Sequence, residues 1–228
     1  RTAKSLFSKS IIFSLIKKTV FAIIIFIFGQ CKLTINNTKS LYFLKLYMRI
    51  ITLTTDLGIK DHYLAVIKGE IYKQIPDINI VDISHEISKF DIQEAAFVFR
   101  NCYKNFPEET IHIIGVNEEL TSKNQHIAME INKQYIIGPD NGIFSLIFEE
   151  ISNANIVHLN ISQDTNNFTF AIKDIFVKAA CHLARGGTLE IIGSLISDFH
   201  NKGSSLKAVT EKDVIRGIIA HIDSYGNA

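Results

Sequence analysis

Cysteine is scarce in this chain, and its placement excludes two kinds of protein. Only Cys31, Cys102 and Cys181 occur among the 228 residues. Three widely separated thiols cannot build a disulfide framework, and they show none of the spacings of a metal site. Cys102 and Cys181 stand among apolar residues in helical patterns, so we expect both to be buried free thiols.

Acidic side chains are absent from the first 47 residues, which contain eight Lys or Arg. The formal net charge of +1 therefore hides an acidic body, because the remaining residues carry 24 − 8 = 16 basic and 23 acidic side chains, a balance of −7. Nucleic-acid-binding domains present a basic patch or stripe, which such a body does not supply. We expect no nucleic-acid partner.

A long apolar run is also missing. The best candidate lies in Lys17–Cys31, "KKTVFAIIIFIFGQC", where two lysines precede about ten apolar residues. A transmembrane helix needs about 20 such residues, so no membrane span is predicted, although the pattern is typical of a signal peptide. Because no methionine precedes Met48, we favour the alternative that residues 1–47 are non-native translated sequence upstream of the true start. Under that interpretation the protein is cytoplasmic.

Repeats, low-complexity tracts and Gly/Ser-rich linkers are missing after Met48. Apolar runs of strand length alternate there with helical patterns, and Pro76 and Pro107 close two of the predicted helices. This alternation predicts an α/β fold with a largely parallel, Rossmann-like sheet flanked by helices. The last residues read as a strand and a turn in which the sequence stops, so we expect a truncated C-terminus.

The residues that follow each strand are the first candidates for a site, because ligands of such sheets bind at the carboxyl ends of the strands. The first strand ends in "TTDLG", which predicts Asp56 at this edge. Its carboxylate could accept two hydrogen bonds from a ribose diol or cap the next helix. Asp61 could cap that helix or face a ligand's ammonium group. No glycine-rich phosphate-binding pattern follows, which excludes a dinucleotide fingerprint.

The end of the second predicted strand and the residues after it contain Asp82, His85, Glu86 and Asp91 within ten residues. They share no helical or strand face, so we expect no metal site among them. His85 is predicted to be a hydrogen-bonded partner at the end of the strand, and Asp91 to cap the next helix.

The third predicted strand ends in "GVNEEL", which places Asn117, Glu118 and Glu119 at the same edge as Asp56. Further on, "GPDNGIF" reads as a turn into a helix. We expect Asp140 or Asn141 to cap that helix, although contact with a ligand is an open alternative.

Several motifs after Met48 together resemble one enzyme family. They are "ITLTTDLGIKDHYLAVIKGEI", "PDINIVDISHEISKFDIQEAAF", "FPEETIHI", "GPDNGIFSLI" and "KDIFVKAACHLARGG". Their order and spacing resemble those of the S-adenosylmethionine (SAM) hydroxide adenosyltransferases, the relatives of the fluorinase and chlorinase enzymes. The resemblance runs from Arg49 to the last residue. It implies an α/β SAM-binding domain over residues 48–210, and a C-terminal β-barrel domain that begins in residues 211–228 and is cut off.

The resemblance also implies an activity. The family's hydrolases attack C5′ of SAM with water or hydroxide and release adenosine and methionine, whereas the halogenating relatives use chloride or fluoride. SAM is the substrate, and neither a metal nor another cofactor is implied. The family is typically trimeric, which implies a homotrimer with sites between subunits.

The residues that match the family's substrate-binding positions come from both ends of the domain. By similarity, Asp56 would bind the ribose diol and Asp61 the methionine end of SAM. Phe90 would lie near the nucleoside, and Asn117 and Phe170 match further substrate-binding positions. Two more residues match the C-terminal motif that contacts substrate across a subunit boundary, namely Asp223 and Asn227.

The chain departs from the family where water is activated. The hydrolases carry "VDPGVGTxRR" where this chain has "VNEELTSKNQ", so Asn117 replaces the aspartate and Asn124 and Gln125 stand at the arginine positions. They carry "FHGRD" where this chain has "FAIKD", so Ala171 replaces the histidine. The Asp–Arg–His set is therefore absent. Ala171 and Ile172 do not support a halide pocket either.

Four interpretations follow, and we favour a divergent SAM hydrolase. In it Asn117, Glu118 or Glu119 would be catalytic and position water, and Lys173 would replace a lost positive charge. The alternative is an inactive paralogue that binds SAM or adenosine. A SAM-dependent halogenase and a structural subunit of a mixed oligomer are weaker interpretations.

Overall fold

The computed structural model describes residues 49–121, 124–148, 154–162, 170–197, 199–200, 208–217, 219 and 221–227. All of them belong to the compact unit that spans Phe43–Ala228. The interpretations of residues 1–47 concern a segment that lies outside these described residues. In the described part of the chain, no helix is long and apolar enough to cross a membrane.

Helices and strands alternate along most of the described chain. Their bounds are β1 (Ile50–Thr55), α3 (Tyr63–Gln74), β2 (Asn79–Ser84), α4 (Ile92–Cys102), the 3-10 turn η1 (Tyr103–Asn105), β3 (Ile111–Gly115), β4 (His126–Ile131), β5 (Gln134–Pro139), α5 (Ile143–Ile147), β6 (Asn155–Leu159), the π-helical turn η2 (Ile172–Phe176), α6 (Val177–Ala184), α7 (Leu189–Ile192), β7 (Gly193–Leu195), β8 (Val209–Glu211) and β9 (Val214–Arg216).

Seven strands form one sheet in the order β2-β1-β3-β5-β4-β6-β7. β2, β1, β3 and β5 are parallel neighbours, whereas β4 runs antiparallel to β5 and β6, and β7 antiparallel to β6. The β4–β5 hairpin closes at Asn132 and Lys133, both with positive φ, which suits the twist of a tight hairpin. The predicted α/β fold with a largely parallel sheet is confirmed.

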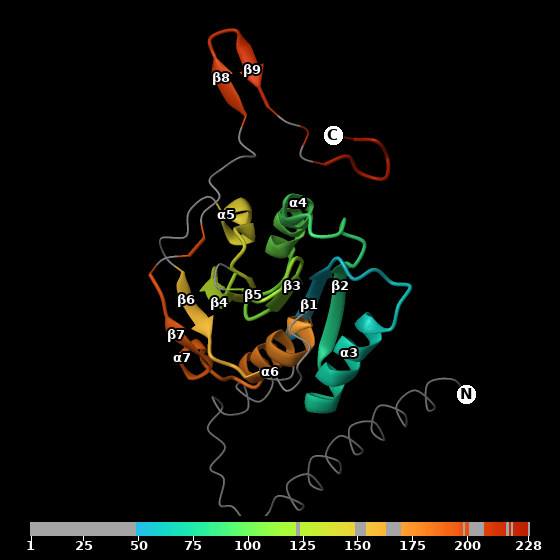
Figure 1. Cartoon of the computed structure of the whole chain (residues 1–228), viewed down its shortest axis with the longest axis vertical. Helices are drawn as coiled ribbons and strands as arrows, with labels where there is room; N and C mark the ends of the chain where they lie inside the picture. The colour runs from blue at the N-terminus through green and yellow to red at the C-terminus, as the bar shows by residue number, and fades with distance from the viewer. Residues whose placement is uncertain are drawn as a thin grey trace, which may run out of the picture. The chain divides into compact units, whose positions relative to one another are not determined.

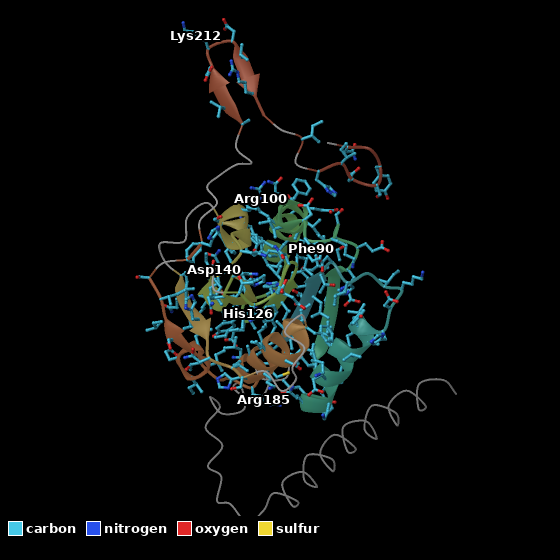
Figure 2. The ribbon with its side chains drawn as sticks, viewed as in Figure 1. Phe90, Arg100, His126, Asp140, Arg185 and Lys212 are labelled. Carbon is cyan, nitrogen blue, oxygen red and sulfur yellow. The ribbon has the colours of Figure 1, made fainter. Side chains whose placement is uncertain are left out.

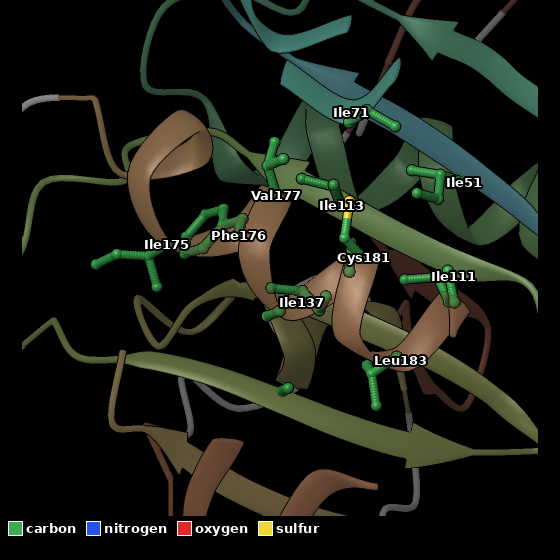
Figure 3. Packing of buried hydrophobic residues seen from close by; sticks show 14 of the residues in the cluster. Ile51, Ile71, Ile111, Ile113, Ile137, Ile175, Phe176, Val177, Cys181 and Leu183 are labelled. Carbon is green, nitrogen blue, oxygen red and sulfur yellow. The ribbon is translucent and has the colours of Figure 1, made fainter. Parts of the chain in front are cut away.

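Helices cover both faces of the sheet (Figure 1). One apolar cluster joins α3, η2, α6 and α7 to one face, and a second joins α4 and α5 to the other. In Figure 3, Phe176, Val177 and Cys181 of this first cluster pack with Ile113 and Ile137 of the central strands. Cys181 is a buried free thiol as predicted, and Cys102 is a free thiol that is half-buried.

The starts of the two crossover helices test the predicted caps. Asp91 caps α4, since its side chain accepts hydrogen bonds from Gln93 and Glu94 N–H. The prediction that Asp61 caps α3 is wrong, because α3 begins at Tyr63 and its N-cap residue is His62, which makes no side-chain cap bond. Asp61 is exposed, one residue too early to reach the first free N–H groups of the helix.

The C-terminal segment contains an antiparallel pair, β8 and β9. This hairpin fits the expected strand near the end of the chain. Whether it begins a separate β domain stays a prediction.

Candidate functional site

The order in which strands are added to the sheet reverses at β1, although the neighbouring strands are parallel. β2 lies on one side of β1 and β3 on the other, and the helices that lead to them, α3 and α4, cover opposite faces (Figure 1). Such a switch point separates the two loops that leave the carboxyl ends of β1 and β3. Thr55 is paired with Gly115, so Asp56 and the residues after Gly115 leave the sheet at the same level.

Asp56 follows β1 and is buried, with 8% of its surface exposed. Its Oδ2 accepts a hydrogen bond of 2.8 Å from Phe90 N–H, and its backbone carbonyl accepts one from Lys89 Nζ. Phe90 has a φ of 64° and its side chain is 70% exposed. The Asp56 carboxylate therefore holds a strained loop in place, and further lone pairs can accept hydrogen bonds from a ligand. The prediction that Asp56 lies at the sheet edge is confirmed.

The β2–α4 loop is fixed by His85. Its Nδ1 lies 2.8 Å from Thr55 Oγ1 and its Nε2 lies 3.1 Å from Asp82 Oδ1. Asp82 also pairs with Lys68 at 2.6 Å. His85 is thus the hydrogen-bonded strand-end residue that the sequence predicted. Among the residues that the structure describes, no group of three His, Cys, Asp or Glu side chains could hold a metal ion.

Glu118 follows β3 and is buried, with 9% of its surface exposed. Its Oε2 accepts a hydrogen bond of 3.2 Å from Ile172 N–H at the start of η2. Burial raises the pKa of Glu118 to about 8, the negative charge of Asp56 acts in the same direction, and the Ile172 bond opposes both. Two acids from neighbouring strands therefore meet at the switch point.

The other two candidates after β3 are placed differently. The side chains of Asn117 and Glu119 are exposed, and Asn117 has a φ of 53°. Their backbone carbonyls accept hydrogen bonds from Asn124 Nδ2 at 3.1 and 2.8 Å. The turn thus directs Glu118 inward and leaves its two neighbours in solvent.

Asn141 supports this turn from the end of β5. Its Nδ2 donates to the carbonyls of Val116 and Asn117, and its Oδ1 accepts from Ile143 N–H at 3.1 Å. The N-cap residue of α5 is Gly142, with a φ of 95°. Asn141 therefore bonds the first N–H of the helix, as predicted, but from the position before the N-cap. Asp140 does not cap α5, since its Oδ1 accepts from His200 N–H.

The segment before α6 completes the edge. Ala171 and Ile172 are fully buried, and Phe170 contacts the Tyr63 ring edge-on with 5.6 Å between centroids. A Cβ atom on Gly115 would lie 2.1 Å from the Ile172 side chain, so a larger residue here would force this side chain of η2 to shift. Isolated π-helical turns are frequent at functional sites.

Asp61, Asp223 and Asn227 are not joined to this edge by any contact in the described part of the chain. Asp61 is exposed. Asp223 Oδ1 accepts from the N–H groups of Tyr225 and Asn227, and its Oδ2 accepts from Asn227 Nδ2 at 2.8 Å. These bonds, above all that of the Asn227 side chain, lower the pKa of Asp223. Their predicted substrate contacts stay predictions.

The sequence did not single out two residues of this edge. His126 begins β4 and is buried, with Nε2 2.8 Å from the Glu118 carbonyl (Figure 2). Burial lowers the pKa of His126, which keeps its imidazole neutral. Asp174 is 2% exposed and pairs with Lys173 at 2.7 Å. The only available signal was a polar residue inside each apolar run, "HIAMEI" and "FAIKDIF".

Comparisons with known proteins agree with this architecture. Residues 51–193 match the model of the SAM hydroxide adenosyltransferase N-terminal domain. The chain is 29% identical over 192 residues to the (R)-S-adenosyl-L-methionine hydrolase of Methanocaldococcus jannaschii, covering 80% of this chain and 68% of that protein. It is 25% identical to the fluorinase of Nocardia brasiliensis, covering 78% and 69% of the two chains.

A crystal structure of an uncharacterized conserved protein from Thermotoga maritima is also similar. It has a TM-score of 0.70 and 31% sequence identity, covering 78% of this chain and 68% of that one. The region that matches the family model, residues 51–193, contains Asp56 after β1, Glu118 after β3, and η2, which donates to Glu118. The chain therefore belongs to the SAM hydroxide adenosyltransferase family.

Proposed function

We propose that this protein is an adenosine-forming SAM hydrolase. The observation that carries the proposal is Asp56, a buried carboxylate at the carboxyl end of β1 at the switch point of the sheet. An ionised carboxylate there suits a ribose diol, which offers two donors. The name of the family model and that of the hydrolase from Methanocaldococcus jannaschii both contain SAM, which supports SAM as the substrate.

The proposed reaction needs positioning more than acid catalysis. SAM carries a sulfonium whose thioether leaves as a neutral group, so the leaving group needs no proton. The protein must hold C5′ in line with a water molecule and keep other water away. Asp56 would bind the ribose, Phe90 and Phe170 would contact the nucleoside, and Asp61 would face the ammonium group of the methionine. No step in this scheme requires a metal.

Water is the nucleophile that the edge favours. A halide would have to approach Asp56 and Glu118, two acids that are close enough for the charge of Asp56 to raise the pKa of Glu118. Ala171 and Ile172, the buried residues where η2 begins beside Glu118, offer no hydroxyl group to bind an anion. Both features disfavour chloride or fluoride and accept a neutral water molecule.

A second candidate function is binding of SAM or adenosine without chemistry. It is favoured by Asn124, at one of the family's arginine positions, whose amide is used to close the turn after β3. Gln125, at the other arginine position, donates to the carbonyl of Thr121. Neither side chain supplies the positive charge of the family pattern, so one part of the family's water-activating set is missing.

Product analysis separates the two functions. The full-length protein is incubated with SAM, with and without chloride, and the products are followed by liquid chromatography and mass spectrometry. A hydrolase gives adenosine and methionine in both conditions. Intact SAM recovered on the protein would establish the binding function, and a chlorinated nucleoside would overturn water as the nucleophile.

The assembly is a further part of this proposal. We expect a homotrimer in which the loop of Asp223 and Asn227 completes the site of a neighbouring subunit. Sedimentation equilibrium of the purified protein measures the mass directly, and a monomer that turns over SAM would contradict a shared site.

A further inference from the structure

Glu118 is a buried acid beside the proposed site of a cationic ligand. It is 9% exposed, and the described part of the chain gives its carboxyl group one hydrogen-bond donor, Ile172 N–H at 3.2 Å. A Cβ atom added to Gly115 of β3 would lie 3.2 Å from Glu118 Oε2, so the carboxyl group packs close to this glycine. Buried in this way, the carboxyl group has little water to stabilise a negative charge.

The charged groups of the neighbouring elements do not compensate for this. Asp56, at the end of β1, carries the same sign of charge and raises the pKa of Glu118 further. Lys89 donates to the Asp56 carbonyl, and Lys173 of η2 is paired with Asp174. His126 of β4 contacts the Glu118 carbonyl and is kept neutral by burial. With a pKa of about 8, Glu118 carries its proton at neutral pH.

A sulfonium ligand changes this balance, because a positive charge near a buried carboxyl group favours its ionised form. We propose that Glu118 releases its proton when SAM binds at this edge, and that the resulting carboxylate then accepts a proton from the attacking water. This inference rests on the proposed function, since it assumes that SAM binds beside Asp56. Binding of SAM would thus convert Glu118 into the general base for the hydrolysis of SAM.

The proposed step balances. On binding, Glu118 gives one proton to solvent. The water oxygen then forms a bond to C5′, the C5′–S bond breaks, and its electron pair stays on the sulfur of methionine. One water proton passes to Glu118, and adenosine keeps the other as part of its new hydroxyl group. Glu118 is again neutral when the products leave, so the site is reset without a cofactor.

Proton release can be measured apart from catalysis by titration calorimetry in buffers with different ionisation enthalpies. We expect close to one proton released per SAM bound at neutral pH by the wild-type protein, and none by Glu118→Gln. S-adenosylhomocysteine is the matched ligand, because it has the same amino acid and nucleoside but a neutral thioether. It should bind with much less proton release. Equal release with both ligands, or by both proteins, would overturn the inference.

Different results would contradict the role of Glu118 and the hydrolase proposal. SAM that binds without releasing a proton contradicts the role of Glu118 and leaves the hydrolase proposal standing. A protein that binds neither SAM nor S-adenosylhomocysteine contradicts both. Because glutamine can still accept the Ile172 N–H bond, Glu118→Gln should fold, and circular dichroism verifies this.

Turnover gives the second readout. Loss of a general base costs on the order of 100-fold or more in kcat, so Glu118→Gln should show that loss, with a higher KM because glutamine cannot pair with the sulfonium. The control is Glu108→Gln, an exposed acid before β3 at the opposite edge of the sheet, paired with Lys133. It should keep wild-type kcat. A fully active Glu118→Gln would contradict the proposed base.

Discussion

At the amino edge of the sheet, Glu109 precedes β3 and lies against Arg49, which precedes β1. Arg49 Nε and Nη2 lie 3.1 and 2.8 Å from Glu109 Oε2, and Lys133 pairs with Glu108 at 2.9 Å. At the carboxyl edge of the same two strands, the charge of Asp56 raises the pKa of Glu118, and the described residues give the two carboxylates no cationic partner. The amino edge of β1 and β3 thus contains ion pairs, and the carboxyl edge contains two acids.

This difference between the two edges separates the ion pairs that stabilise the fold from the acids that could bind a ligand. A partly buried carboxylate beside arginine is favourable, since the two charges satisfy one another. A buried acid beside another acid lowers stability, or keeps its proton, until a cation arrives. The carboxyl edge therefore has the electrostatics expected of a site for a cationic ligand, and the amino edge does not.

The largest expected effect is on stability, when Glu118→Gln removes one of the two acids at the carboxyl edge. In the folded protein Glu118 stays protonated to about pH 8, whereas in the unfolded chain it ionises above its ordinary pKa of 4.5. Between these values the unfolded chain binds fewer protons, so the stability of the wild-type protein falls as pH rises. The stability of the variant should not show this fall with pH. Near pH 8 its free energy of unfolding should exceed that of the wild-type protein by up to about 5 kcal/mol. Urea denaturation from acidic to mildly basic pH measures it, and parallel pH profiles for the two proteins would show that Glu118 ionises normally.

A smaller effect is expected when the other acid of the pair is removed. Asp56→Ala should weaken adenosine binding by about 1.5–3 kcal/mol, as for a lost hydrogen bond to a charged group. Asp56→Asn is the matched variant, because its amide oxygen can still accept from Phe90 N–H. It should weaken binding less. Calorimetry measures both affinities, and wild-type affinity in Asp56→Ala would refute the ribose role.

The smallest effect is expected at the amino edge. Arg49→Met should lower the free energy of unfolding by about 1–2 kcal/mol, because Glu109 keeps partial access to water when its partner is lost. Chemical denaturation measures the loss, and adenosine affinity should stay at the wild-type value because Arg49 lies at the opposite edge. A large loss of affinity in this variant would mean that the two edges are not independent.

Much of the fold could be predicted from the sequence, because its signals are local. The alternation of strand and helix patterns gave the α/β class, and Asp91 immediately before "IQEAAF" gave a cap that the structure contains. Asp56 was placed correctly because it directly follows a buried strand. The α3 cap was wrong by one position, which shows the limit of reading caps from residue type alone.

The decisive features of the site depend on contacts between distant residues. The sequence offered Asn117, Glu118 and Glu119 as equal candidates, and only the turn, with its positive φ at Asn117, selects Glu118. Its partner Ile172 is 54 residues away in the chain. Gly115 is required by a side chain that no local pattern connects to it. Such burial follows from tertiary packing, which neither propensity nor periodicity encodes.

Turnover of SAM in water enriched in heavy oxygen tests the central claim most directly. If the carboxyl edge aims water at C5′, the adenosine formed contains the heavy isotope in its 5′-hydroxyl group, and the methionine contains none. Adenosine without the label, a halogenated nucleoside, or SAM recovered intact after prolonged incubation would contradict the account.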